Sequence, residues 1–437
     1  MDCFRIEGGH ELSGRLAVEG SKNASLPLMA AALLSDGPVD LLGVPDLSDT
    51  RNMIRLLAEL GVETDESEAG RLRFKTVDST SVHARYDIVR TMRASICVLG
   101  PMLARRGRAV VSMPGGCAFG SRPVDLHLRG LEALGATVRL DGGDIHCTAD
   151  RLKGTTIFLG GPFGSTVLGT ANVMSAAAVA EGTTIIESAA CEPEIADLAR
   201  LLNAMGAKIE GAGTPRLVIE GVEALGSAAH RVMPDRIVAG TYAVAAAVTD
   251  GDIEITDFPY ECLLAAIDRL DQIGVAVERL DETEDPMRCR VRVTRACEPR
   301  PTIITTQPHP GFPTDLQAQF MTLLCLAKGN SIITEKIYPE RFMHVAELGR
   351  MGAELIRQGP TAMVVGGREL VGAPVMASDL RASACLVLAG LAAKGETIVN
   401  RVYHLDRGYY RMEEALNGLG ARIERLDDRE LPDPVEA

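Results

Sequence analysis

The sequence contains no tryptophan, few other aromatic residues and no long uninterrupted apolar run. No run reaches the roughly 18 apolar residues that a membrane-spanning helix needs. The first residues, MDCFRIEGGHELSG, also lack the basic stretch and following apolar stretch that are typical of a secretory signal. These absences predict a cytoplasmic protein that does not associate with membranes.

The ten cysteines form no C-x-x-C pair and no cluster with histidine at metal-binding spacing. Cys97, Cys325 and Cys385 stand in apolar runs, where a free thiol behaves as a small hydrophobe. This pattern favours a reducing compartment and argues against disulfides and structural zinc.

Positive charge is also in short supply, because 45 Lys and Arg face 59 Asp and Glu, for a net charge of −14. An acidic chain is a poor general binder of nucleic acid. It can still bind small anions if its basic residues are gathered in one cleft. The length of 437 residues, with 46% hydrophobic and 24% charged residues, predicts a globular protein of two domains.

A pattern of an apolar residue, glycine, and alanine or valine closes an amphipathic stretch six times, at intervals of roughly 70 residues. Its glycines are Gly61, Gly135, Gly206, Gly274, Gly352 and Gly420. In each copy an Ala-rich apolar helix comes first, and we expect a left-handed glycine to end it. Those glycines are Gly37, Gly107, Gly182, Gly251, Gly329 and Gly395.

Six such helix–strand–helix–strand units predict an α/β protein of two halves with three units each. The Ala-rich helices are apolar on all sides, as in LGTANVMSAAAVAEG at residues 168–182. A helix of this kind belongs in the interior. We therefore expect these helices to lie together beneath the sheets.

The stretch SMPGGCAFGSRPVDLHLRG at residues 112–130 holds glycines and prolines that exclude regular helix and strand. It lengthens the second copy of the repeat, which favours a functional loop. Cys117 lies within it, and the nearby Arg122 would favour its thiolate. From the residues alone, a reactive thiol and an inert one remain equally open.

Basic residues stand at helix starts and strand-to-helix loops in several copies. Such positions bind anions through free N–H groups and the helix dipole. Any one of them alone would ordinarily be solvated, and Asp315 or Asp379 alone would be an N-cap. Together they predict a focused anion site, formed by Lys22, Arg93, Arg122, Arg341, Arg381 and Arg407.

Seven segments in register, between about residues 5 and 426, resemble the UDP-N-acetylglucosamine 1-carboxyvinyltransferases, a family of enolpyruvyl transferases. These segments are GSKNASLP, TMRASI, MPGGCAFGSRPVDLH, PHPGFPTDLQAQF, ERFMHV, SDLRASACLVLAG and YHLDRGYYR. The resemblance implies two inside-out α/β barrels, or α/β prisms, of three units each, which close on the sugar. It also implies that the N-terminal strands join the C-terminal half, giving domains of 22–230 and of 1–21 with 231–437. Composition predicts a disordered tail at 427–437.

The resemblance further implies the reaction. The enolpyruvyl group of phosphoenolpyruvate passes to the 3-hydroxyl of UDP-N-acetylglucosamine and phosphate leaves, in the first committed step of peptidoglycan synthesis. Cys117 would be the general acid, which the epoxide fosfomycin alkylates, and Asp315 the acceptor of the hydroxyl proton. Lys22 and Arg407 would complete the catalytic set.

The substrate-binding residues implied in the same way are Asn23, Arg93, Arg122, Pro123, Val124, Asp125, Leu126, Thr166, Val167, Ile337, Arg341, Asp379 and Arg381. We expect a monomer that needs no cofactor or metal and whose partners are the two substrates.

One segment departs from the family pattern, which has a lysine and then Ser-Val-Gly at the diphosphate. Here Gly164 stands near the lysine position and Thr166-Val167-Leu168 replaces the tripeptide. Three alternatives follow: the enzyme acting on shikimate 3-phosphate, an enzyme acting on UMP, and a silent paralogue that only binds nucleotide sugar. The PGGC and RPVDLH segments argue against the first, the changed loop leaves room for the second, and the retained Cys117 and Asp315 argue against the third.

Overall fold

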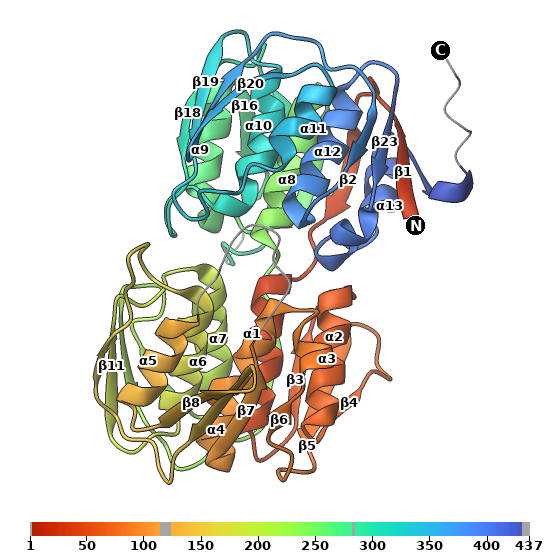
Figure 1. Ribbon diagram of the computed structural model, residues 1–437. Coiled ribbons are helices and arrows are strands. Elements are labelled where there is room, and N and C mark those ends of the chain that lie inside the picture. The colour runs from red at the N-terminus through yellow and green to blue at the C-terminus, as the bar shows by residue number, and fades with distance from the viewer. Residues whose placement is uncertain (1, 114–123, 282–284, 431–437) are drawn as a thin grey trace. The chain divides into compact units, whose positions relative to one another are not determined.

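The computed structural model describes residues 2–113, 124–281 and 285–430 (Figure 1). These residues divide into two compact units. The N-terminal unit comprises residues 20–113 and 124–233. The C-terminal unit comprises residues 2–19, 234–281 and 285–430.

Three four-stranded sheets form the described part of the N-terminal unit. In spatial order they are β14 (Ala228–Arg231), β3 (Val39–Leu42), β5 (Arg71–Thr76) and β4 (Val62–Asp65); β6 (His83–Ala84), β7 (Arg108–Ser112), β9 (Asp144–Thr148) and β8 (Thr137–Asp141); and β10 (Thr156–Phe158), β11 (Thr183–Glu187), β13 (Arg216–Glu220) and β12 (Lys208–Glu210). The helices are α1 (Lys22–Ala31), α2 (Ser48–Glu59), α3 (Tyr86–Val89), α4 (Leu99–Arg106), α5 (Asp125–Ala133), α6 (Val167–Ala177) and α7 (Pro193–Ala204).

The C-terminal unit repeats this plan within its described residues. Its sheets are β2 (Ser13–Ala17), β15 (Asp252–Phe258), β17 (Cys289–Arg295) and β16 (Val275–Arg279); β18 (Ile303–Thr305), β19 (Asn330–Thr334), β21 (Thr361–Val365) and β20 (Glu354–Gln358); and β22 (Pro374–Met376), β23 (Glu396–Asn400), β1 (Asp2–Glu7) and β24 (Arg422–Asp427). The helices are α8 (Arg236–Val248), α9 (Leu264–Ile273), α10 (Gln317–Cys325), α11 (His344–Arg350), α12 (Leu380–Ala392) and α13 (Met412–Asn417). Short 3-10 helices are η1 (Ala32–Leu34) and η2 (Arg93–Val98) in the N-terminal unit, and η3 (Tyr260–Leu263), η4 (Thr314–Leu316), η5 (Val402–Arg407) and η6 (Asp428–Glu430) in the C-terminal unit.

All six sheets share one pairing scheme. One edge strand runs parallel to its neighbour, and the other two pairings are antiparallel, as β6–β7, β7–β9 and β9–β8 illustrate. A parallel pair needs a long crossover, and an inner helix such as α4 supplies it. The N-terminal strands belong to the sheets of the C-terminal unit, since β2 is parallel to β15 and β1 lies between β23 and β24.

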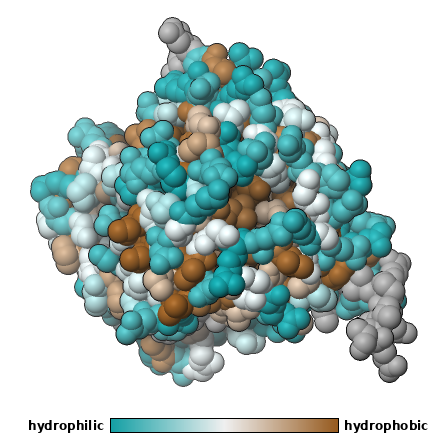
Figure 2. All heavy atoms as spheres, turned by 90° about the horizontal axis from the view of Figure 1, so that it is seen from above, coloured by the Kyte–Doolittle hydropathy of each residue, from teal (hydrophilic) through white to brown (hydrophobic). Residues whose placement is uncertain are grey.

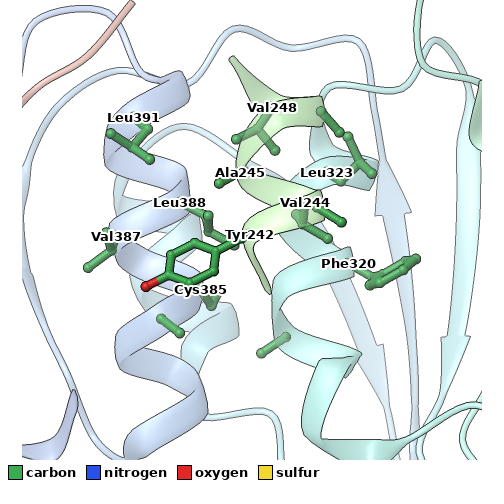
Figure 3. Packing of buried hydrophobic residues seen from close by; sticks show 14 of the residues in the cluster. Tyr242, Val244, Ala245, Val248, Phe320, Leu323, Cys385, Val387, Leu388 and Leu391 are labelled. Atoms are coloured by element: carbon green, nitrogen blue, oxygen red, sulfur yellow. The ribbon is translucent and has the colours of Figure 1, made fainter. Parts of the chain in front are cut away.

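The Ala-rich helices form the interior of each unit, as their apolar composition predicts. Every residue of α8 and α10 is buried, and α12 has buried residues along its whole length. Figure 3 shows side chains of these three helices gathered in one core, including Tyr242 of α8, Phe320 of α10 and Leu388 of α12. The small residues allow close packing, and the sheets lie outside the helices (Figure 1). The predicted fold, an inside-out α/β barrel in each half, is confirmed.

The six glycines that close the outer helices all adopt a left-handed conformation, with φ between 77° at Gly61 and 107° at Gly206. A side chain would strain the backbone here. Each of these glycines follows the end of a helix, as the repeat pattern predicts, although their left-handed conformation was not part of that prediction. The prediction for the inner helices is only partly right. Gly107 is a left-handed C-cap, whereas Gly182, Gly329 and Gly395 have positive φ but follow the helix end by several residues.

Gly37 and Gly251 are not left-handed, which corrects the helix-stop prediction for both. Each is a point of close packing instead. A Cβ on Gly37 would lie 2.1 Å from Ser227 Oγ, and one on Gly251 would lie 2.4 Å from the Leu12 carbonyl oxygen. Glycine is therefore needed at both positions for space.

Figure 2 shows a face on which hydrophilic residues predominate and hydrophobic residues occur in small groups. In the described ranges, no helix combines the length and the apolar character needed to cross a membrane. Asp427 ends β24 and residues 428–430 form η6, so regular structure extends into the segment for which composition predicts disorder. Residues 431–437 lie outside the described residues.

Candidate active site

Asp315 lies between two buried arginines in the C-terminal unit. It belongs to η4, just before α10, and its side chain is 24% exposed. Arg341 Nη1 donates to Asp315 Oδ1 at 2.7 Å, and Arg381 Nη2 donates to Oδ2 at 2.7 Å. The two guanidinium groups are less than a tenth exposed. This arrangement leaves the carboxylate as the accessible part of a buried ionic cluster.

The two arginines keep Asp315 ionised. Burial alone would raise its pKa, but the charges and hydrogen bonds of Arg381 and Arg341 outweigh burial and hold the pKa well below its ordinary value. Asp315 is therefore a carboxylate at neutral pH and can accept a proton.

A buried polar network holds Arg381 from the opposite side. The Tyr409 hydroxyl lies 3.3 Å from Arg381 Nη1 and 2.9 Å from Thr241 Oγ1 of α8. Gln319 of α10 donates to Tyr409, to Thr241 and to the Asp315 carbonyl oxygen. Because Thr241, Gln319 and Arg381 come from α8, α10 and α12, the inner helices themselves position the cation.

Asp379 and Arg407 lie in the same neighbourhood. Asp379 is the N-cap of α12, and its Oδ1 accepts from the backbone N–H of Arg381 at 2.9 Å and of Ala382 at 3.2 Å. Burial lowers the pKa of His404, Arg407 lowers it further, and Asp379 opposes both. Arg407 and Asp379 therefore both lie within electrostatic range of His404.

His344 of α11 is a buried histidine whose pKa is affected by Asp379 and Arg341. Its side chain is almost fully buried, and burial lowers its pKa to about 4. The charge of Asp379 raises this pKa and that of Arg341 lowers it, so His344 lies near both. His344 is consequently neutral at physiological pH.

In the N-terminal unit, Ser21 caps α1 by accepting from the Ala24 N–H at 3.3 Å. Lys22 and Asn23 are the first two residues of this helix and are partly exposed. Lys22 Nζ lies 3.3 Å from Oδ2 of Asp49, a buried residue in the first turn of α2. A buried carboxylate thus fixes the lysine at the helix start, where anions are favoured.

Arg93 begins η2, which packs against α1. Burial and the Arg93 charge lower the pKa of His127 of α5 to about 3, which places Arg93 near the start of that helix. Asn172 of α6 lies 2.9 Å from His127 Nδ1, donates to the Ile96 carbonyl and accepts from the Gly100 N–H. This network joins η2, α4, α5 and α6.

Val124, Asp125 and Leu126 form the start of α5, and Thr166 and Val167 form the start of α6. Thr166 Oγ1 caps α6 by accepting from the Gly169 N–H at 3.2 Å. Helix α5 packs against α6, and a Cβ on Gly161, in the loop that leads to α6, would be only 3.1 Å from Leu126 Cδ1. The loop before α6 therefore lies against the start of α5.

Gly164, where the sequence departs from the family pattern, lies in a tight turn. Gly161 and Gly164 exchange N–H···O hydrogen bonds of 2.8 and 3.1 Å, and Gly164 has φ of +99°. A lysine at this position would be strained in this tight turn.

Cys117, Arg122 and Pro123 lie outside the described residues, so their predicted roles stay predictions. The remaining predicted residues fall into two groups. Asp315, Ile337, Arg341, Asp379, Arg381 and Arg407 lie in the C-terminal unit, and Lys22, Asn23, Arg93, Val124, Asp125, Leu126, Thr166 and Val167 lie in the N-terminal unit. In the part of the chain that the structure describes, no cluster of His, Cys, Asp or Glu is arranged to hold a metal ion.

Sequence reasoning missed several polar residues around these groups, namely Asp49, Thr241, Thr314, Gln319, Glu335 and Tyr409. Tyr409 stands inside the segment YHLDRGYYR, which was the only available signal for it. Thr314 and Gln319 likewise stand inside the segment PHPGFPTDLQAQF, whereas Asp49, Thr241 and Glu335 carry no spacing or composition that separates them from ordinary helix and loop residues.

Comparison with known proteins identifies the family. The sequence profile of EPSP synthase (3-phosphoshikimate 1-carboxyvinyltransferase) matches residues 6–416. The chain is 51% identical over 428 residues to a UDP-N-acetylglucosamine 1-carboxyvinyltransferase of Magnetococcus marinus, covering 98% of this chain and all of that protein. Proteins of the same name from Nitratidesulfovibrio vulgaris and Geobacter metallireducens are 51% and 50% identical over the same shares.

Solved structures agree. The enolpyruvyl transferase NikO from Streptomyces tendae superposes with a TM-score of 0.86 at 27% identity, covering 97% of this chain and 98% of that one. EPSP synthase from Acinetobacter baumannii shares the fold, with a TM-score of 0.75 at 18% identity, covering 98% of this chain and all of that one. The chain belongs to the EPSP synthase family, and within it to the UDP-N-acetylglucosamine 1-carboxyvinyltransferases.

Proposed function

We propose that this protein transfers the enolpyruvyl group of phosphoenolpyruvate to the 3-hydroxyl of UDP-N-acetylglucosamine and releases phosphate. The identity of about half of all residues with enzymes of that name, over nearly the whole chain, supports this substrate pair. The observation that carries the chemistry is the ionised Asp315 between Arg341 and Arg381.

The reaction is an addition followed by an elimination. The hydroxyl oxygen bonds to C2 of phosphoenolpyruvate while C3 takes up a proton. Loss of phosphate from C2 and of a proton from C3 then restores the double bond. The first step needs a base for the hydroxyl and an acid for C3. Asp315 has the partial exposure and the ionised state that a base requires, and Cys117 is the proposed acid.

The basic residues suit the two anionic groups of phosphoenolpyruvate. Lys22 stands at the start of α1, and Arg341, Arg381 and Arg407 gather around Asp315 and Asp379. Fixed cations of this kind stabilise charge that develops in the transition state. An anionic substrate beside Arg341 and Arg381 would share their charge. We therefore expect its binding to raise the pKa of Asp315 and to make the carboxylate a stronger base.

The nucleotide half of the acceptor is assigned to the N-terminal unit. The loop before α6 approaches the start of α5 at Gly161 and Leu126, and Arg93 lies near the first turn of α5. These segments supply backbone N–H groups at helix starts together with a cation, which is the chemistry that binds a diphosphate.

Phosphate release by the purified protein tests this proposal. The protein is mixed with phosphoenolpyruvate and one of three acceptors: UDP-N-acetylglucosamine, UMP or shikimate 3-phosphate. We expect rapid release of phosphate when the acceptor is UDP-N-acetylglucosamine and no release when it is UMP or shikimate 3-phosphate. Release only with UMP or only with shikimate 3-phosphate would refute the substrate assignment, and release with none would refute the proposed activity.

A further inference from the structure

Glu335 is a buried carboxylate beside the candidate active site. It follows β19 directly and has no exposed surface. Its Oε1 accepts from the Thr306 hydroxyl at 2.7 Å and from the backbone N–H groups of Ile337 and Tyr338 at 2.8 and 3.0 Å. These bonds hold the turn that carries Ile337 and leads on to Arg341.

The other oxygen of Glu335 reaches the site through one hydroxyl. Thr314 Oγ1 donates to Glu335 Oε2 at 2.9 Å and accepts from Arg341 Nη1 at 3.0 Å. The same Nη1 donates to Asp315 Oδ1 at 2.7 Å. Glu335, Thr314, Arg341 and Asp315 therefore form one continuous chain of hydrogen bonds.

The chemistry of the end groups fixes the direction of this chain. An arginine can only donate, an ionised carboxylate can only accept, and a hydroxyl has a single proton. The Thr314 proton must therefore point to Glu335, which turns the lone pairs of Thr314 Oγ1 toward Arg341. The Thr314 hydroxyl is a neutral acceptor, so it holds the Arg341 guanidinium without replacing Asp315 as the counter-ion of that arginine.

We propose that Glu335 is a positioning residue, which fixes Arg341 on the Asp315 carboxylate through Thr314 and holds the backbone of Ile337 with its other oxygen. This role rests on the proposed function of the site. In this role Glu335 does not touch the substrate, and it keeps Arg341 in a fixed position relative to the Asp315 carboxylate.

Glutamine at position 335 breaks the chain with little change in shape. Its amide oxygen can replace Oε1 and keep three of the four donors, but its NH2 group then faces Thr314. Both neighbours of the hydroxyl are now donors, and the Thr314 proton loses its acceptor. Arg341 must share Thr314 Oγ1 with a second donor, so its position on Asp315 is weakened.

The experiment compares four variants of the full chain. Glu335→Gln and Thr314→Val interrupt the chain, whereas Thr314→Ser keeps the hydroxyl. Thr334→Val is the matched control, because Thr334 Oγ1 lies 3.1 Å from Thr361 Oγ1 on β21 and this bond does not lead to Arg341. For each variant we would measure kcat, KM, their pH dependence and the thermal midpoint of unfolding.

We expect kcat to fall about tenfold to a hundredfold in Glu335→Gln and Thr314→Val, the range for a lost hydrogen bond to a charged group. The acidic limb of the pH profile should move to higher pH, since a less constrained Arg341 lowers the pKa of Asp315 less. Thr314→Ser and Thr334→Val should retain the wild-type profile. A purely structural role would lower the thermal midpoint without moving the limb.

A crystal structure of Glu335→Gln gives a result that does not depend on turnover. We expect the contact between Arg341 Nη1 and Asp315 Oδ1, 2.7 Å in the wild type, to lengthen or break. An unchanged contact, or an unmoved pH profile in Glu335→Gln, would overturn the positioning role. Absence of turnover by the wild type would instead refute the proposed function, and the crystal structure would still decide the role of Glu335.

Discussion

Asp315 joins the two roles that a site residue can have, because it is both the candidate base and the partner of two buried cations. Removal of its charge affects each role separately. The reaction loses a proton acceptor, and the folded protein is destabilised because Arg341 and Arg381 lose the carboxylate that pairs with both of them. A residue that only capped a helix would show neither effect.

We therefore expect Asp315→Asn to lower kcat by about 10² to 10⁴-fold, the usual contribution of a general base. The free energy of unfolding should fall by about 1–3 kcal/mol, because buried donors lose an ionised acceptor. Steady-state kinetics and urea unfolding measure the two effects.

Asp40 offers a matched control, since it also accepts from two arginines, Arg71 and Arg73. It lies on β3, in a sheet outside the inner helices, and is not one of the residues of the candidate active site. Asp40→Asn should leave kcat unchanged. An equal loss of activity in both variants would argue against a catalytic role for Asp315.

Asp40 also makes a signed prediction about pH. A hydrogen bond from Arg73 and, against the opposing effect of burial, one from Arg71 lower its pKa from 3.8 to about 2. A lowered pKa stabilises the folded state above the unfolded value of about 4, and this contribution disappears as the pH falls through about 2. The difference in unfolding free energy between wild type and Asp40→Asn should therefore shrink on acidification. Urea unfolding as a function of pH measures this difference, and growth of the difference toward low pH would contradict the assignment.

The cysteines give a prediction about selectivity. Burial raises the pKa of Cys97, Cys147 and Cys325 to about 12, so they contain little thiolate near neutral pH. We expect fosfomycin to alkylate Cys117 and to spare these three. Peptide mass spectrometry after incubation would locate the adduct, and labelling of a buried cysteine with Cys117 unmodified would count against the assigned reactivity.

The sequence could predict that a residue belongs to the site where the residue lies in a segment that resembles the family. Asp315, Arg341 and Arg381 are examples, and the structure brings them into contact. Glu335 could not be predicted, because it lies outside these segments and a single carboxylate has no characteristic spacing. Thr314 lies inside the segment that contains Asp315, but the sequence does not show that its hydroxyl bonds to Glu335 and Arg341. Their connection exists only after two loops from different parts of the chain fold together.

At the scale of elements, the six copies of the repeat share a backbone conformation at the end of the second helix. The six glycines after the outer helices are left-handed in every copy. The glycines after the inner helices are not equivalent, because Gly37 and Gly251 are required for close packing. Sequence alone could not separate these two uses of glycine, since both follow an apolar helix.

Gly206 isolates the backbone effect. It has φ of +107° and nothing within 4 Å of a Cβ placed on it. Gly206→Ala should lower the free energy of unfolding by about 1–2 kcal/mol through left-handed strain alone. Gly349 in α11 also has open space but lacks positive φ, so Gly349→Ala should stabilise the protein slightly through helix propensity. Denaturant midpoints measure both, and a stabilising Gly206→Ala would contradict the role assigned to left-handed glycine at this turn.

At the scale of the whole molecule, local patterns predicted much of the architecture. The roughly 70-residue spacing and the Ala-rich helices indicated three units per half and an interior made of helices. They could not indicate that β1 lies between β23 and β24, since that pairing joins Phe4 to Val399 and Arg425 across almost the entire chain. Only the resemblance to a family implied that the N-terminal strands go with the C-terminal half.

A competition experiment tests the central claim most directly. The protein is given phosphoenolpyruvate together with UDP-N-acetylglucosamine, UMP and shikimate 3-phosphate at equal concentrations, and mass spectrometry identifies the products. We expect that UDP-N-acetylglucosamine is the one acceptor that gains a carboxyvinyl group in place of a hydroxyl proton. One phosphate should be released for each molecule of product. A carboxyvinyl group on UMP or shikimate 3-phosphate instead, or phosphate release without any such product, would contradict the account.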